Sequence, residues 1–346
     1  MEILSCENVA FKYNESTDYA ISDCTFSVKK GEKIMLCGAS GSGKSTLLRL
    51  LKRELSPRGE LSGNITLMGK DRSELSDRES AEKIGFVMQS PDSQTVCDKV
   101  SAELAFGLES FGVKSGEIQS RVGEMAAFFG IEPLYDRDIS TLSGGQKQLV
   151  ALCSVMATDP DILLLDEPTA QLDPIAAREL LGILDRLNKE MGVTIIIAEH
   201  DPEELFDSCD KILYLAKGKT EFFGTPALTA KYFVKNALEG FLPETAKAFA
   251  RLCDDLPLNV RQGRAKLEKL GVTDIPKQAV TDTERAEPYA LQCKNLWQRY
   301  EKNSPDILKG CDLGIRKGEC YGILGSNGGG KSTLLRVICG LCKPYM

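Results

Sequence analysis

The sequence predicts an α/β fold with a doubly wound parallel core, present once in full and begun a second time. Three observations lead to this prediction. Short apolar segments typical of buried strands alternate with segments of helical periodicity. A glycine-rich loop directly follows the first buried strand, Lys33–Cys37. The opening of the chain also recurs near its end, which indicates a duplicated domain.

The recurrence centres on two glycine-rich loops. Lys44 and Lys331 occupy the same place in these loops and are 287 positions apart. The flanking residues match at the same offset without a gap: Cys6 with Cys293, Asn8 with Asn295, Tyr13 with Tyr300, Cys24 with Cys311, and Gly31-Glu32 with Gly318-Glu319. A repeat of this length predicts a second copy of the first domain.

Composition limits the class of protein. The chain has 346 residues, of which 42% are hydrophobic and 27% charged, so it is globular and long enough for two domains. Its net charge of −7 argues against a general nucleic-acid binder. Residues 1–7 lack a targeting pattern, and the apolar runs are too short to span a bilayer. Any membrane role therefore requires a membrane partner.

The chain contains 12 cysteines. Without a targeting segment, this number indicates reduced thiols in the cytosol, and not a disulfide framework. We expect most to act as small hydrophobic residues on strands and helices, as at Cys37, Cys153 and Cys320. Cys339 and Cys342 form a C-x-x-C pair, but a structural zinc site would need two further ligands nearby.

The elements of the first copy follow in order. Residues 3–28 alternate as antiparallel strands around a turn at Asn14–Asp18. Lys33–Cys37 is a buried strand, and Lys44–Leu51 has the apolar spacing of a helix that packs on a sheet. Residues 101–130 are predicted to be helical and rich in polar residues.

Two further buried strands follow, at Asp161–Asp166 and Val193–His200, with the continuous apolar character of parallel sheets. From about residue 225 to 270 the pattern becomes helical, most clearly at Ala230–Leu238 and Glu244–Leu252. We therefore divide the chain into a complete domain (residues 1–238), a helical connector (239–288) and a truncated second domain (289–346).

The first loop has the pattern G-x-x-x-x-G-K-[ST], in which backbone N–H groups can surround phosphates because glycines leave room. Lys44 would contact the β- and γ-phosphates, and Ser45 would offer a hydroxyl to Mg²⁺. The alternative is a glycine-rich turn that binds no nucleotide. The candidate nucleotide-binding residues of this loop are Gly38, Ala39, Ser40, Gly41, Ser42, Gly43, Lys44, Ser45 and Thr46.

Two carboxylates follow the apolar strand Ile162–Leu165. Asp166 lies at the strand end, where it can hold Mg²⁺. Glu167 is placed to accept a proton from a water that attacks the γ-phosphate, so it is the candidate general base. An exposed acidic strand end is the alternative interpretation.

The most specific motif is Leu142-Ser143-Gly144-Gly145-Gln146, which opens a helix at Gln146–Ala157 and forms a second anion-binding helix start. With it the chain resembles the ATP-binding subunits of ABC transporters over residues 1–235. The resemblance implies a P-loop NTPase domain of the ABC type, with an antiparallel β subdomain, a parallel α/β core and a helical subdomain. It also implies ATP with Mg²⁺, bound between two domains arranged head to tail, so that Ser143–Gln146 serve the site of the opposite domain.

The same resemblance assigns further positions. Tyr13 matches the residue that stacks on adenine, with an ordinary core tyrosine as the alternative. Gln89 matches the glutamine that touches Mg²⁺ and senses the membrane subunit, and Asp173 matches an aspartate at the domain interface. His200 is the single histidine of the chain. A lone histidine is more often structural, but this one matches the histidine that contacts the γ-phosphate, so we count it as catalytic with Glu167 and Lys44.

The second copy supplies a second set of candidate nucleotide-binding residues: Tyr300, Gly325, Gly328, Gly330, Lys331, Ser332 and Thr333. This copy lacks the strand carboxylates, the signature and the histidine. A single chain therefore builds no complete hydrolytic site, whereas two chains could pair through their first domains. We expect the full-length protein to extend past Met346, residues 289–346 to be marginal as an independent fold, and Tyr321–Leu324 to present an open apolar strand edge.

A narrower resemblance lies at Ser90–Gln94 and Ala105–Glu109. These segments resemble those of the ATPases of energy-coupling-factor (ECF) importers, which take up vitamins and transition-metal ions. The two ATPase domains of such importers are sometimes fused in one chain. This implies a transmembrane partner and a location at the cytoplasmic face of the membrane, with no nucleic acid as partner. The main alternative is a soluble tandem ABC ATPase on the ribosome, which would favour a basic connector, whereas this one is nearly neutral. A chromosome-maintenance ATPase would need a long coiled coil, for which the sequence has no heptads.

Overall fold

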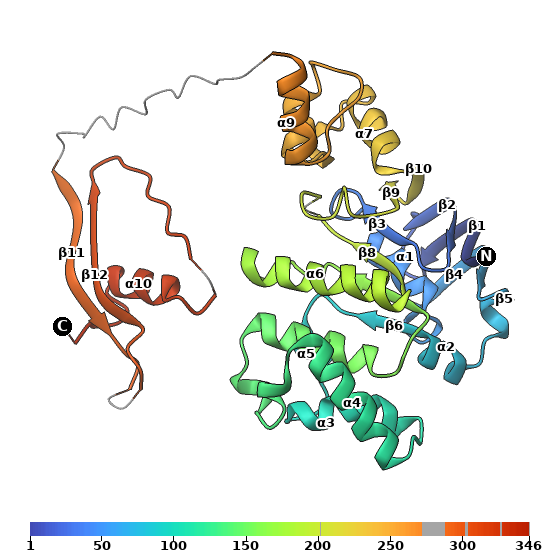
Figure 1. Cartoon of the computed structure of the whole chain (residues 1–346), viewed down its shortest axis with the longest axis horizontal. Helices are drawn as coiled ribbons and strands as arrows, with labels where there is room; N and C mark the ends of the chain where they lie inside the picture. Colours follow the sequence, from blue (N-terminus) through green and yellow to red (C-terminus); the bar gives the residue numbers. More distant parts are fainter. Residues whose placement is uncertain (201, 272–287, 302–303, 326, 346) are drawn as a thin grey trace. The chain divides into compact units, whose positions relative to one another are not determined.

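The computed structural model describes residues 1–200, 202–271, 288–301, 304–325 and 327–345. The chain divides into two compact units (Figure 1). The first consists of Met1–Leu172 and Ala176–Thr273, and the second of Asp173–Ile175 and Asp274–Met346. The α/β class predicted from the sequence is confirmed in the first unit, which contains two sheets and the helices that cover them.

The first sheet of this unit is antiparallel, with strand order β2-β1-β4-β5. Its long pair, β1 and β2, lies on either side of the predicted turn after Tyr13, which confirms the antiparallel opening of the chain. The strands are β1 (Glu2–Tyr13), β2 (Ile21–Lys29), β4 (Gly59–Leu67) and β5 (Lys70–Asp71).

The second sheet has the order β10-β9-β3-β8-β7-β6. All neighbouring strands run parallel except β10, which is antiparallel to β9. The three strands predicted to be buried lie side by side in it, as β3 (Lys33–Cys37), β8 (Thr194–Ala198) and β7 (Ile162–Asp166). The remaining strands are β6 (Ile84–Val87), β9 (Lys211–Ala216) and β10 (Lys219–Gly224).

The apolar strands of this sheet separate two hydrophobic cores. Side chains of a strand alternate between the two faces of a sheet, and in β3 Ile34 and Leu36 join the core that contains α1 (Lys44–Leu51) and the antiparallel sheet. Met35 and Cys37 join the larger core formed with the other helices. Because both faces are covered, the central strands are apolar at consecutive positions.

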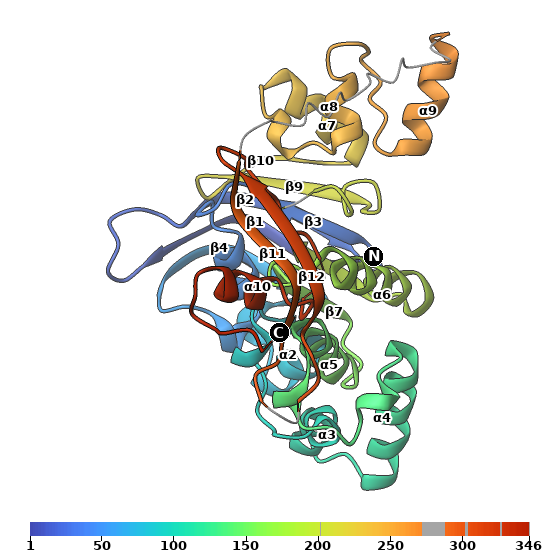
Figure 2. The same ribbon diagram turned by 90° about the vertical axis from the view of Figure 1, so that its left-hand side faces the viewer.

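Within the first unit, α3 and α4 lie at one end and α7, α8 and α9 at the other, with α5 and α6 between them (Figure 2). The segment predicted as one helical stretch is two helices, because Gly112 between them has a φ of 73°. The helices are α2 (Asp77–Lys83), α3 (Val100–Ser110), α4 (Ser115–Phe129), α5 (Gly144–Met156), α6 (Pro174–Met191), α7 (Pro226–Lys235), α8 (Glu244–Phe249) and α9 (Val260–Lys269). Single 3₁₀ turns are η1 (Arg53–Leu55), η2 (Arg72–Glu74), η3 (Pro91–Ser93), η4 (Glu132–Leu134), η5 (Ile139–Thr141) and η6 (Glu239–Phe241).

Side chains from residues 230–258 pack onto the large core of the first unit. Phe233 is fully buried, and its ring lies 5.1 Å from that of Tyr214 on β9 and 5.7 Å from that of Phe241. Leu242 and Phe249 belong to the same core. Part of the segment predicted as a connector therefore shares this core, while its residues 272–287 lie outside the described residues.

The second unit contains β11 (Tyr289–Gln298), antiparallel to β12 (Leu308–Arg316), and α10 (Lys331–Ile338). Leu296, Leu308, Leu313 and Leu334 form its small core. The bounds of β12 and α10 are those of β2 and α1 at the offset of the sequence repeat.

Two predictions for the second unit are wrong. Tyr321–Leu324, predicted as a strand edge, forms no strand, and Leu324 is 95% exposed. Cys320, predicted at an apolar position, is also exposed. A parallel strand needs neighbours for its backbone hydrogen bonds, and among the described residues of this unit β11 and β12 pair with each other.

All twelve cysteines lie among the described residues, and each is a free thiol. Cys37 and Cys153 are buried as predicted, and burial raises the pKa of each thiol to about 12. In the part of the chain that the structure describes, none of the helices combines the length and apolar character that a membrane crossing requires.

Candidate nucleotide-binding and hydrolysis site

The glycine loop after β3 forms a cradle in which side chains at two positions would clash. A Cβ at Gly38 would lie 2.2 Å from the carbonyl oxygen of Leu215, and one at Gly43 would lie 2.6 Å from that of Ala20. Gly43 also has a φ of 102°, in the left-handed region. Glycine is therefore required at these two positions for the loop to pack against the chain behind it, and the loop has the glycine-rich form of a phosphate-binding loop.

Lys44 begins α1 and folds back over this loop. Its Nζ donates to the carbonyl oxygens of Gly38 at 2.8 Å and Ala39 at 3.2 Å, and the residue is 4% exposed. Burial lowers the pKa of Lys44, while the nearby Glu167 carboxylate opposes this shift. A cation held at the mouth of a helix N-terminus fits an anionic ligand such as the phosphates of ATP.

Ser45 and Asp166 come together from α1 and β7. The Ser45 hydroxyl donates to Asp166 Oδ1 at 2.8 Å. Burial raises the pKa of Asp166, and the Ser45 hydrogen bond partly offsets this effect. Both residues line a cavity of about 370 Å³ with Gln89 and Arg49. A hydroxyl, a carboxylate and an amide oxygen are the ligands that Mg²⁺ prefers, so these residues fit the metal.

The Glu167 carboxylate is held by side chains from two other segments. Its Oε1 lies 2.5 Å from His200 Nε2, and its Oε2 accepts a hydrogen bond from Gln89 Nε2 at 3.0 Å. Glu167 has a φ of 50°, which is uncommon for a residue with a side chain and is typical of functional sites. The structure thus brings together three of the residues singled out in the sequence.

Tyr13 lies beside the glycine loop. Its hydroxyl and the hydroxyl of Thr46 are 2.9 Å apart, and its ring packs edge-on against Phe11 with centroids 5.0 Å apart. The ring is partly exposed. It is therefore fixed in place and still has a face that a base can stack on.

The second loop repeats this local geometry. Lys331 Nζ donates to the Gly325 carbonyl oxygen at 2.6 Å, and the hydroxyls of Tyr300 and Thr333 are 3.1 Å apart. Gly330 has a φ of 87°, close to that of Gly43. A Cβ at Gly325, however, would find its nearest neighbour among the described residues at 4.0 Å, in the Lys331 Cδ. Among the described residues, the first glycine of the second loop therefore has less closely packed surroundings than the first glycine of the first loop.

The signature residues lie apart from the first glycine loop. Ser143 caps α5 and forms a capping box with Gln146, with distances of 3.0 Å and 3.3 Å for the two hydrogen bonds. Ser143 and Gly144 are exposed. Asp173 accepts a hydrogen bond from the Ile175 amide at 3.0 Å. The side-chain hydrogen bonds described for Ser143 and Gln146 are those of this capping box.

Two residues that contribute to the site were not identified from the sequence. Gln94 accepts from the Met88 amide at 2.9 Å and donates to the Phe86 carbonyl at 3.0 Å, which fixes the segment that carries Gln89. Glu199 is buried directly after β8, within the segment predicted only as a strand. A carboxylate that directly follows the apolar run Ile195–Ala198 was the available signal.

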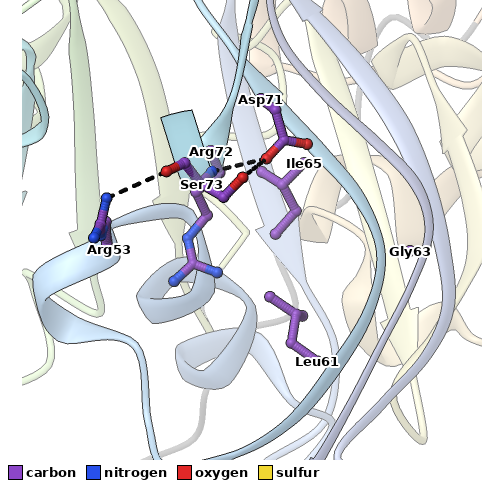
Figure 3. Close-up of a pocket in the computed structure, with 7 residues that line it drawn as sticks. All are labelled: Arg53, Leu61, Gly63, Ile65, Asp71, Arg72 and Ser73. Atoms are coloured by element: carbon purple, nitrogen blue, oxygen red, sulfur yellow. Dashed lines mark hydrogen bonds between the residues drawn. The ribbon is translucent and has the colours of Figure 1, made fainter. Parts of the chain in front are cut away.

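A second cavity, of about 360 Å³, lies beside the antiparallel sheet (Figure 3). Two of its polar side chains, Asp71 and Arg53, bind neighbouring groups of the same turn. Asp71 Oδ1 accepts from the amide and hydroxyl of Ser73 at 2.8 Å and 2.5 Å. Arg53 Nη1 donates to the carbonyl oxygens of Ser73 and Leu75. These contacts stabilise the turn at η2, so we assign this cavity no part in the nucleotide site.

The fold and the first site together define a P-loop ATP-binding domain. The family model for ABC transporters matches residues 21–170 and 308–346, which is more than half of the chain. The chain therefore belongs to the ABC transporter family of ATP-binding proteins, a class of ATPases that use ATP with Mg²⁺.

Individual relatives agree with this assignment. A protein of Bacillus thuringiensis subsp. konkukian, assigned to the ABC transporter ATP-binding proteins, is 40% identical over 338 residues, which are 97% of this chain and 61% of the relative. This chain thus spans about three fifths of the length of the curated relatives that it matches. CbiO1 from Clostridium perfringens, described as part of the ABC transporter complex CbiONQ, is 31% identical with a TM-score of 0.62, over 77% of this chain and 98% of CbiO1.

A third match is a dimeric structure of the ATP-binding cassette MJ0796, in a post-hydrolysis state with ADP and Pi. It is 27% identical, with a TM-score of 0.56, and the match covers 64% of this chain and 98% of that one.

Proposed function

We propose that this chain is the ATP-hydrolysing subunit of an ABC importer of the energy-coupling-factor type, which takes up a vitamin or a transition-metal ion. The observation that carries the proposal is the joining of Glu167 to both His200 and Gln89, beside the buried pair Ser45 and Asp166. A carboxylate, a histidine and a magnesium site next to a phosphate-binding loop are the parts that ATP hydrolysis requires.

Each residue has a role in this proposal. Lys44 and the loop amides orient the β- and γ-phosphates of ATP, and Tyr13 stacks on the base. Ser45, Asp166 and Gln89 hold Mg²⁺, which neutralises phosphate charge when bound. Glu167 accepts the proton of the attacking water, and His200 positions this carboxylate.

The exposed signature, Ser143–Gln146, supports pairing with a second ATP-binding domain. The capped start of α5 presents backbone N–H groups to solvent, and such a helix N-terminus favours anions. We propose that it completes the site of another domain in a head-to-tail arrangement, supplied by a second chain or by a further domain.

A hydrophobic groove supports pairing with a membrane subunit. It lies between β6 and α3 and has a volume of about 280 Å³. Among its lining residues, Val96 is 65% exposed and Phe106 is 43% exposed. We propose that an amphipathic helix of the membrane subunit occupies it, since it lies directly beside the segment that holds Gln89.

Co-purification tests this function. The tagged chain, expressed in its natural host and extracted in mild detergent, is expected to bring down an integral membrane protein and to hydrolyse ATP with it. Phe106→Asp should abolish this association, whereas Tyr135→Asp, a change at another partly exposed aromatic side chain, should not. Recovery of ribosomal subunits in place of a membrane protein would support the soluble translational ATPase instead.

A further inference from the structure

The Glu199 carboxylate joins two segments that carry the proposed chemistry. The residue follows β8 directly and is 4% exposed. Its Oε1 accepts hydrogen bonds from Thr169 N at 3.1 Å and Thr169 Oγ1 at 2.7 Å. Its Oε2 accepts a hydrogen bond from the His200 amide at 3.3 Å. One buried side chain thus contacts the loop after β7 and the histidine after β8.

This junction begins where the parallel ladder ends. Strands β7 and β8 pair as far as Asp166 and Ala198, and the Glu167 amide adds one more bond to the Ala198 carbonyl at 2.9 Å. Past that point, two side-chain contacts described between the segments remain: the Glu199 carboxylate binds Thr169, and the Glu167 carboxylate lies against the His200 ring. The loop itself is a compact turn, because Ala170 N donates to Glu167 O at 3.2 Å.

A carboxylate is a costly side chain to bury, and burial raises the pKa of Glu199 to about 7. The cost is offset here by three N–H and O–H donors, which a shorter or apolar side chain would leave without a partner. The direct consequence is geometric: the turn that starts at Glu167 and the backbone of His200 are fixed relative to each other.

We propose that Glu199 is a positioning residue that sets the placement of Glu167 relative to His200, through its hydrogen bonds to Thr169 and to the His200 amide. The inference rests on the proposed hydrolytic function and adds a residue that touches neither nucleotide nor metal. A displacement of about 1 Å at a catalytic group can cost about 10²-fold in rate. The loss should therefore appear in kcat, because the loop that binds ATP is left unchanged.

The variants Glu199→Ala, Glu199→Gln and Thr169→Val test this role in the full chain with its partner. Glu199→Ala should lower kcat by about 10²-fold and leave the Kd for ATP close to that of the wild type. Glu199→Gln keeps an oxygen for Thr169 but turns an amide NH₂ toward the His200 amide, so it should recover only part of the rate. Thr169→Val loses only the 2.7 Å hydrogen bond from Thr169 Oγ1. Its kcat should also lie between those of the wild type and Glu199→Ala. The matched control is Glu190→Gln, at an exposed position of α6.

Two measurements separate positioning from a general structural effect. The double variant Glu199→Ala, Thr169→Val should be no slower than Glu199→Ala alone, because both changes remove the same interaction. Hydrogen exchange should show faster exchange of the Thr169 amide in Glu199→Ala, with exchange in β7 unchanged. Wild-type kcat in Glu199→Ala, additive losses in the double variant, or unchanged exchange at Thr169 would each overturn the proposal.

The exchange measurement also keeps this inference separate from the proposed function. A wild-type protein that does not hydrolyse ATP with its partner would contradict the function, whereas Thr169 exchange would still decide whether Glu199 holds the loop. If Glu199→Ala fails to fold, Glu199→Gln and Thr169→Val carry the test, because both preserve side-chain volume closely.

Discussion

Replacing Lys44 with alanine should weaken ATP binding by an amount that follows from its surroundings. The Lys44 Nζ is buried and held by two loop carbonyls, so its charge is directed at the cradle with little freedom to move. A hydrogen bond to a charged group contributes about 1.5–3 kcal/mol. Each 1.36 kcal/mol is a factor of ten, so the Kd for ATP should rise about 10- to 150-fold.

Lys331→Ala is the comparison that the chain itself supplies. Lys331 makes the same bond to its own loop, at 2.6 Å, but no carboxylate pair follows it in this chain. Turnover should therefore fall sharply in Lys44→Ala and change little in Lys331→Ala. Lys189→Ala, at an exposed position of α6, controls for the loss of a charge.

Binding of a fluorescent ATP analogue and phosphate release measure the two quantities. Equal losses of turnover from Lys44→Ala and Lys331→Ala would refute the assignment of hydrolysis to the first loop. An unchanged Kd in Lys44→Ala would refute the role of this ammonium in holding phosphate.

Three further predictions follow from the site and the core. Glu167→Gln should lower kcat by about 10²–10⁴-fold while ATP binding is retained, as single-turnover phosphate release would show; a rate near that of the wild type would exclude Glu167 as the base. Because burial raises the pKa of Glu199 to about 7, this carboxylate is ionised above pH 7 and protonated below it. Turnover should therefore fall as the pH is lowered through about 7. Glu167 and Lys44 are charged groups near Glu199. In Glu199→Gln, the fall in turnover near pH 7 should be absent from the pH profile. Phe233→Ala should destabilise the first unit by about 3–5 kcal/mol in urea unfolding, since the ring is fully buried; a change below about 1 kcal/mol would mean that α7 is not part of that core.

The sequence was most informative where local pattern and chemistry coincide. The run Lys33–Cys37 predicted β3 to the residue, because a strand covered on both faces carries consecutive apolar side chains, here Ile34–Cys37. The helix α1 was also predicted with its observed bounds, because its apolar spacing is that of a helix on a sheet and the glycines before it mark its start. Asp166 and Glu167 could be placed together because a strand end fixes which residues reach the edge of the sheet.

Interactions between distant segments could not be predicted in this way. The bond between Glu199 and Thr169 joins residues 30 positions apart, and it depends on β7 and β8 being neighbours in the sheet. Gln94 was noted only as part of the Ser90–Gln94 resemblance, and its hydrogen bonds to the backbone at Phe86 and Met88 could not be predicted, because they depend on how the segment folds back onto β6. At Tyr321–Leu324 the apolar pattern alone predicted a strand, although a strand also requires neighbours.

The described glycines of the two loops adopt matching backbone conformations in different settings. Gly38 and Gly325 have φ angles of 155° and 156°, and Gly41 and Gly328 of 76° and 79°, although only the first loop continues from a strand. Two contacts are common to both loops: the lysine Nζ donates to the carbonyl of the first glycine, and a tyrosine hydroxyl meets a threonine hydroxyl. These shared contacts lie within each copy, so we expect a loop with its tyrosine and lysine to keep this form where the strand before it differs.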